Sequence, residues 1–105
     1  MPQPLRQRLL LPALVTLLPF AGTGDGYYSP AKEQIRQSVN AFIRDSGEFD
    51  GVIDFDRALA DPQQPDRLHA DYHKGDHLHP SPAGYRRMAD SIDLQLLMPP
   101  TSVRD

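Results

Sequence analysis

Asp76 and His79, an aspartate and a histidine three positions apart, are the side chains of this sequence best suited to acid–base chemistry. A carboxylate that accepts the Nδ1 proton of an imidazole fixes the tautomer of the ring, so the other ring nitrogen can take a proton from a hydroxyl. Pro80 closes this stretch, and Ser81 followed by Pro82 is a helix-start signal, with serine as N-cap and proline in the first turn. We therefore expect Asp76 and His79 on a short loop fixed by a following helix, where reactive side chains are common.

Two strands and two helices are expected to position this loop. The apolar run 13–18 is typical of a buried parallel strand, and residues 49–55 form the second strand candidate. A helix is predicted from Ser29-Pro30 to Gly47 with one apolar face, formed by Ala31, Ile35, Val39, Phe42 and Ile43. On this helix, polar residues are expected to point away from that face: Lys32, Glu33, Arg36 and Gln37.

After Pro82 a second helix is predicted to run to Met98, where two prolines follow. Its apolar residues again share one face: Tyr85, Met88, Ala89, Ile92 and Leu96. The segment between the second strand and the histidines, 56–71, contains several prolines and aspartates, so we expect irregular loop there. Two polar residues are weaker candidates for a functional role. Asp54 is expected to cap the turn after the second strand, and Asn40 is expected to be structural.

The residues around the Asp–His pair resemble the last motif block of the SGNH/GDSL hydrolases. The resemblance is carried by Asp76-His77-Leu78-His79-Pro80, by Ala83-Gly84-Tyr85 and by Met88-Ala89, and it extends over about residues 14–97. It implies an α/β fold, the C-terminal part of a three-layer flavodoxin-like parallel sheet with about two strands and two main helices. It further implies hydrolysis of a small-molecule acyl ester by a Ser-His-Asp triad, with Asp76 as orienting residue and His79 as general base.

The sequence departs from that family in its nucleophile. The family's Gly-Asp-Ser block, and the glycine and asparagine blocks that complete its oxyanion hole, have no counterpart here. Gly24-Asp25-Gly26 is the nearest match to the first block, with glycine where the serine should be. We therefore expect a partial hydrolase domain at residues 13–98, inactive and poorly stable alone, between an extension at 1–12 and a disordered tail at 99–105.

A metal-binding module is the first competing hypothesis, because the four histidines and two nearby aspartates are clustered. The histidines are His69, His73, His77 and His79. His73 and His77 would share a face only on a helix, which Gly75 disfavours, and structural zinc sites usually take ligands from separated segments. We expect no metal or cofactor, and solvated loop histidines at 69, 73 and 77.

Composition excludes some other function classes. The net charge of −3 offers no basic surface for nucleic acid, and the absence of cysteine excludes a disulfide framework. Arg6, Arg8 and the apolar run up to Leu18 also resemble a secretory signal peptide, which would make the chain a secreted or periplasmic non-catalytic protein. Pro12 suits a strand edge better than the middle of a signal, and the run is too short to span a membrane.

Overall fold

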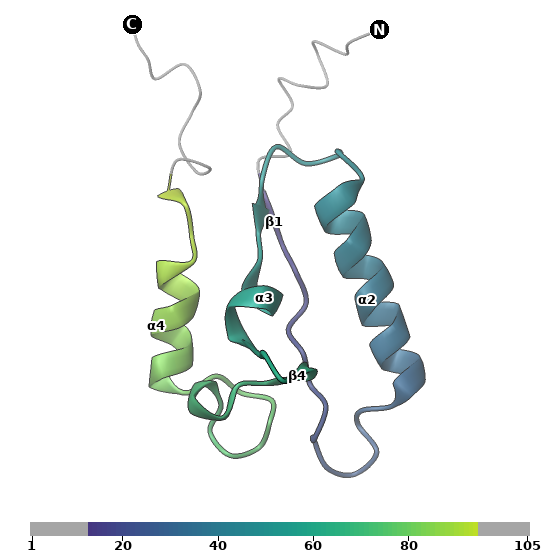
Figure 1. Ribbon diagram of the computed structural model, residues 1–105, viewed down its shortest axis with the longest axis vertical. Helices are drawn as coiled ribbons and strands as arrows, with labels where there is room; N and C mark the ends of the chain where they lie inside the picture. The colour runs from purple at the N-terminus through teal and green to yellow at the C-terminus, as the bar shows by residue number, and fades with distance from the viewer. Residues whose placement is uncertain (1–12, 95–105) are drawn as a thin grey trace, which may run out of the picture.

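The structure, a computed structural model, describes residues 13–94. It is a mixed α/β arrangement, with a parallel pair of short strands between two helices (Figure 1). Helix α2 (Pro30–Asp45) lies on one side of strand β1 (Leu14–Val15), and helix α4 (Pro82–Asp90) lies on the other. The α/β class, the parallel strand pair and the two main helices predicted from the sequence are therefore confirmed.

The parallel pair joins β1 to β2 (Val52–Ile53), with Leu14 opposite Val52 and Val15 opposite Ile53. Both strands are shorter than the predicted ranges 13–18 and 49–55. The second strand ends early because Asp54 becomes the N-cap of the next helix, accepting a hydrogen bond from the backbone N–H of Arg57 at 3.0 Å. The expected capping role of Asp54 is confirmed.

The prediction of irregular loop at 56–71 was wrong. This segment contains most of a short helix, α3 (Phe55–Leu59), and an antiparallel hairpin of β3 (Ala60–Asp61) and β4 (Gln64–Leu68). A single 3₁₀ turn, η1 (Ala70–Tyr72), follows. The prolines did not prevent pairing because Leu59 and Leu68, which are 0% and 1% exposed, anchor the hairpin in the core.

Helix α2 begins as predicted, since the Ser29 hydroxyl accepts a hydrogen bond from the Lys32 N–H at 3.2 Å. The prediction of its buried face was wrong for most positions. Ile35 is 63% exposed and Phe42 55% exposed, whereas the polar Arg36 is 2% exposed. The buried face runs through Arg36, Asn40 and Ile43. Polar residues occupy it because partners far away in the sequence satisfy them.

A network of charged and polar groups joins α2 to the sheet and to α3. Arg36 donates to Asp56 at 2.7 Å, and Arg44 donates to both Asp54 and Asp56, at 2.7 and 2.9 Å. Burial would raise the pKa of Asp54, but the hydrogen bonds from Arg44, from the Arg57 N–H and from Thr16 outweigh it and lower that pKa to about 2. These contacts hold the corner after β2 against α2.

Asn40 completes this network and is structural, as expected. Its side chain is 0% exposed and forms two hydrogen bonds with the backbone of Leu17, accepting from the N–H at 2.7 Å and donating to the carbonyl at 3.0 Å. Its amide also donates to Asp56 at 3.2 Å. One side chain therefore ties the end of the β1 segment to α2 and α3.

Helix α4 starts at the predicted position, because the Ser81 hydroxyl accepts a hydrogen bond from the Gly84 N–H at 3.1 Å. It ends at Asp90, with Ser91 as C-cap, so the predicted continuation through Ile92 was wrong. Leu96 and Met98 lie outside the described residues, as do the extension predicted at 1–12 and the tail predicted at 99–105.

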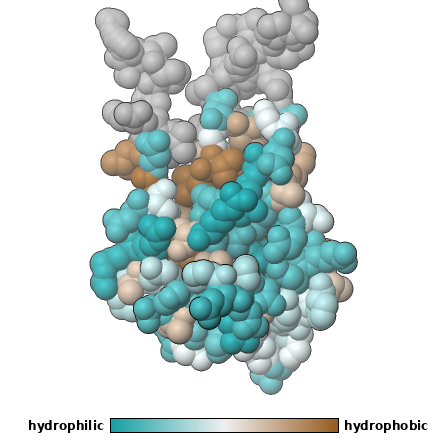
Figure 2. Space-filling model, viewed as in Figure 1, coloured by the Kyte–Doolittle hydropathy of each residue, from teal (hydrophilic) through white to brown (hydrophobic). Residues whose placement is uncertain are grey.

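Apolar side chains remain exposed on the described part of the chain. Many of them lie on the β1 segment (Leu14, Val15 and Leu17) and on α2 (Ile35, Val39 and Phe42). In the view of Figure 2 the strongest apolar colour lies toward the upper end of the described part, and the rest of that face is mostly hydrophilic. Within residues 13–94, none of the helices is long and apolar enough to cross a membrane.

Candidate active site

The loop that carries Asp76 and His79 is closed at its base by backbone pairing. His73 and Pro80 form an isolated antiparallel bridge, and the Lys74 N–H donates to the His79 carbonyl at 3.0 Å. The Ser81 N–H donates to the Tyr72 carbonyl at 2.9 Å, which fixes the loop to the start of α4. The predicted loop, held by a following helix, is therefore present.

Within this loop Asp76 and His79 lie side by side. The His79 Nδ1 atom is 2.6 Å from the Asp76 Oδ2 atom, a short distance that is typical of a charge-assisted hydrogen bond. The other carboxylate oxygen, Oδ1, accepts hydrogen bonds from the N–H groups of Leu78 and His79, both at 2.9 Å. The carboxylate is thus fixed by the backbone and can in turn hold the imidazole in the Nδ1–H tautomer.

The electrostatics of the pair favour an ionised carboxylate. Hydrogen bonds from the His79 ring and from the His79 and Leu78 N–H groups hold the pKa of Asp76 well below its usual range. Both side chains are open to solvent, since the His79 side chain is 65% exposed and that of Asp76 46%. Such a pair can present Nε2 as a proton acceptor to a hydroxyl placed beside it.

The other three histidines do not behave as free loop residues. The Nδ1 atom of His69 caps the 3₁₀ turn by accepting from the Asp71 N–H at 3.0 Å. The rings of His73 and His77 pack against each other, with their centroids 4.3 Å apart and their planes tilted by 31°. The His77 Nδ1 atom is buried and has no hydrogen-bond partner in the described region, so this side of the ring is shielded from solvent, while the residue as a whole is partly exposed.

The compact loop explains this burial. His77 adopts a left-handed backbone conformation with φ of 61°, which turns its ring toward Gly22, where a Cβ atom would come within 3.0 Å of the ring. Histidine tolerates this conformation better than most residues. Across residues 13–94, no three histidine, aspartate or glutamate side chains are grouped so that they could hold a metal ion.

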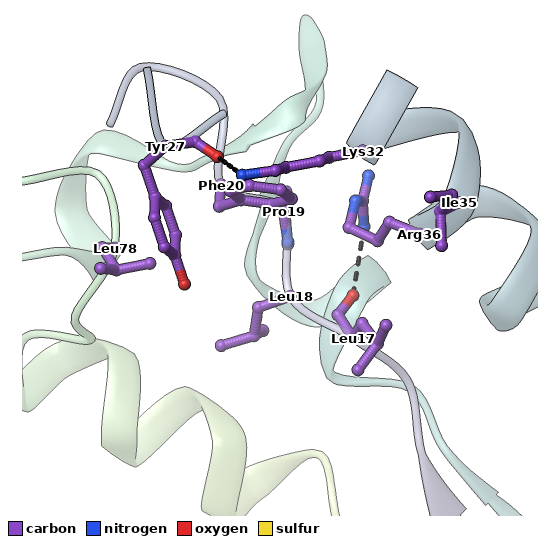
Figure 3. Close-up of a pocket in the computed structure, with 9 residues that line it drawn as sticks. All are labelled: Leu17, Leu18, Pro19, Phe20, Tyr27, Lys32, Ile35, Arg36 and Leu78. Atoms are coloured by element: carbon purple, nitrogen blue, oxygen red, sulfur yellow. Dashed lines mark hydrogen bonds between the residues drawn. The ribbon is translucent and has the colours of Figure 1, made fainter. Parts of the chain in front are cut away.

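A largely apolar pocket of about 390 Å³ adjoins this loop through Leu78, which lies between the two residues of the pair (Figure 3). No local sequence pattern indicates this pocket, because its walls come from separate segments: residues 17–20, Tyr27, Lys32, Ile35, Arg36 and Leu78. The Tyr27 ring faces into the pocket opposite Leu18 and close to Leu78. The two cations are already engaged, since Lys32 donates to the Tyr27 carbonyl at 2.8 Å and Arg36 to the Leu17 carbonyl at 3.1 Å.

The sequence matches the profile of the GDSL-like lipase/acylhydrolase family over residues 3–92, which is most of its length. The chain belongs to this family. The match includes the whole loop that holds Asp76 against His79, and it agrees with the resemblance seen in the sequence. No curated protein gives a significant match to the chain.

The serines of this GDSL family member are mostly engaged in local structure. Ser29 and Ser81 cap the N-termini of α2 and α4. Ser46 accepts from the Glu48 N–H at 3.2 Å, and Ser91 donates to the Met88 carbonyl at 2.7 Å. Ser38 lies on the exposed side of α2. Among the described residues, none of these five serine side chains forms a hydrogen bond with the Asp76–His79 pair.

Proposed function

We propose that this chain supplies the general base and the orienting carboxylate of a serine ester hydrolase, and that the nucleophilic serine belongs to a segment outside the chain. Family membership supports hydrolysis of acyl esters. The observation that carries the proposal is the 2.6 Å contact between His79 Nδ1 and Asp76 Oδ2, because it is the arrangement that a base and its orienting group require.

In this proposal His79 Nε2 takes the proton of the serine hydroxyl as its oxygen attacks the acyl carbon. Asp76 stabilises the imidazolium that forms, and His79 then gives the proton to the departing alcohol. A water molecule, activated by the same nitrogen, cleaves the acyl-serine and restores the free hydroxyl. The exposure of His79 fits this scheme, since its outer nitrogen must be accessible to a second reactant.

Two features support a nucleophile from outside the chain. The serines of the described region are either used as caps and turn residues or lie away from the pair. In addition, β1 pairs with β2 only over two residues, and the apolar side chains of β1 and α2 remain exposed. Parallel sheets are normally covered on both faces, so these surfaces suit further strands and helices of the same hydrolase domain.

The pocket beside Leu78 indicates an apolar acyl group. Its walls are mainly aliphatic and aromatic, and both of its cations are already hydrogen-bonded to protein groups. An acyl chain in this pocket would keep its carbonyl carbon near the loop that holds His79. We propose small-molecule esters of apolar acids as the substrate class, with no cofactor.

Hydrolysis of p-nitrophenyl acetate tests the proposal in two forms of the protein. The chain alone is expected to show no turnover above that of its His79→Ala variant. The chain extended by an upstream in-frame segment with a Gly-Asp-Ser block is expected to show turnover that depends on His79.

In the extended protein, Asp76→Asn should lower kcat by about 10⁴-fold, because the amide favours the wrong tautomer of His79. Asp71→Asn is the matched control, since this nearby exposed carboxylate does not contact His79. Turnover by the chain alone that is lost in His79→Ala would refute the external nucleophile. Equal effects of the two asparagine variants would refute the role of Asp76.

A further inference from the structure

The imidazole of His73 lies at the base of the loop and accepts two backbone hydrogen bonds from inside it. Its Nδ1 atom accepts from the Gly75 N–H at 2.9 Å and from the His77 N–H at 3.1 Å. These two residues flank Asp76, so the donors that bind His73 lie on either side of the carboxylate. A neutral imidazole accepts only at its unprotonated nitrogen, so this contact requires the Nε2–H tautomer.

The backbone that these bonds hold is unusual. Gly75 has φ of 103° and His77 has φ of 61°, both in the left-handed region that most residues avoid. Glycine adopts such a conformation freely, but a residue with a side chain, such as His77, keeps it only where surrounding contacts enforce it. The packing of the His73 ring against the His77 ring, at 4.3 Å between centroids, adds a second contact at the same place.

We propose that His73 is a positioning residue for the Asp76–His79 pair: its neutral ring holds the turn that places the carboxylate against the catalytic imidazole. This inference rests on the proposed function only in taking Asp76 and His79 as the catalytic pair. The hydrogen bonds that carry it lie between His73 and the backbone.

The proposal predicts a loop that opens in acid. Protonation of His73 at Nδ1 converts the acceptor into a donor that faces two N–H groups, so both bonds are lost. The titratable and charged groups that influence His73 are His77 and Asp76 in the loop and Arg67 on β4. Burial, then His77 and Arg67, lowers the pKa of His73, and Asp76 opposes this only in part. The neutral ring is therefore retained at neutral pH, and the loop loosens as pH falls below about 6.5, the value of a free histidine.

The test compares two substitutions in the full ¹⁵N-labelled chain by NMR. His73→Asn keeps an acceptor oxygen at the position of Nδ1, whereas His73→Phe keeps a ring for stacking and removes the acceptor. His69→Phe is the matched control, because His69 also accepts one backbone N–H but lies outside the loop. The readouts are amide exchange at Gly75 and His77 and the Nδ1 proton of His79, whose hydrogen bond to Asp76 shifts it far downfield.

We expect His73→Phe to speed amide exchange of His77 by about tenfold, the equilibrium effect of one lost hydrogen bond, and to broaden the His79 proton. In His73→Asn and His69→Phe, the amide exchange rate of His77 should stay within about twofold of its rate in the unmodified chain. In the unmodified chain, the protection of the Gly75 and His77 amides and the downfield His79 proton signal should both be lost progressively below about pH 6.5. In His73→Asn, both should persist below that pH.

An unchanged amide exchange rate at His77 in His73→Phe would overturn the proposal. An equal loss of amide protection in His73→Phe and His73→Asn would also overturn it. Amide protection of Ile43 in α2 shows whether a variant is folded. If His73→Phe is not folded, the pH profiles of the unmodified chain and of His73→Asn test the proposal instead. Absence of the downfield His79 proton in the unmodified chain would instead count against the proposed function. The exchange of Gly75 and His77 would still test His73 in that case.

Discussion

Replacement of Asn40 by alanine should destabilise this chain more than any exposed substitution on the same helix. Asn40 is fully buried and is the acceptor for the Leu17 N–H, at 2.7 Å. Its two donated bonds matter less, because the Leu17 carbonyl keeps the hydrogen bond from Arg36 at 3.1 Å and Asp56 keeps that from Arg44 at 2.9 Å. The main loss is therefore one part-buried N–H left without a partner.

The magnitude follows from three contributions. An unsatisfied N–H costs about 1–3 kcal/mol, and the small cavity left by the amide costs about 1 kcal/mol more. The higher helix propensity of alanine returns about 0.5 kcal/mol. The free energy of unfolding should therefore fall by about 1.5–3.5 kcal/mol in Asn40→Ala.

Urea denaturation followed by far-UV circular dichroism measures this difference, with the slope of the transition expected to stay unchanged. Ser38→Ala is the matched control, because Ser38 lies on the exposed side of the same helix and should shift the free energy by less than about 0.5 kcal/mol. If Asn40→Ala unfolded at the same urea concentration as Ser38→Ala, the Asn40 side chain would not stabilise the packing of the β1 segment on α2, contrary to this prediction.

Three further outcomes are expected. Gly84→Ala should lower the free energy of unfolding by about 1–3 kcal/mol in urea melts, because its Cβ atom would collide with the Tyr72 carbonyl, whereas Gly24→Ala meets open space and should have little effect. The pKa of Asp54 is lowered to about 2, so its contribution to the free energy of unfolding is present above about pH 4 and is lost as pH falls toward 2. Asp54→Asn keeps the helix cap but cannot ionise, so its free energy of unfolding should lack that part of the loss in an acid titration. The chain alone should have a free energy of unfolding below about 5 kcal/mol and should self-associate at high concentration, because apolar side chains are exposed. Ile35→Lys should reduce that association in analytical ultracentrifugation. A monomer that unfolds in a sharp cooperative transition would contradict this prediction.

Features set by neighbouring residues could be predicted from the sequence. Both long helices begin at a serine followed by proline, as expected, because capping depends on residues within one turn. The contact between Asp76 and His79 was predictable for the same reason, since three positions on a short loop leave the two side chains within reach. The general position of the parallel strands also followed from local apolar composition.

Features that depend on distant partners could not be predicted. The apolar period of α2 indicated that Ile35 and Phe42 would be buried, but Arg36 is buried instead because Asp56, twenty positions away, pairs with it. The β3–β4 hairpin was missed because its prolines suggest loop, and the pairing becomes favourable only through the burial of Leu59 and Leu68 in the assembled core. The acceptor role of His73 was also hidden, because it depends on two left-handed residues.

In the loop between His73 and Pro80, the spacing within the Asp76–His79 pair and the orientation of that pair are set by different contacts. The spacing of Asp76 and His79 is fixed inside one closed stretch of chain, by bonds that start and finish within it. In the proposed hydrolase, the orientation of the pair toward a reactant would depend instead on how α4, through Ser81, is seated on the remainder of the protein. Damage elsewhere in the fold should thus leave the pair intact but misdirected, a defect visible in turnover and invisible in the spectrum of the histidine.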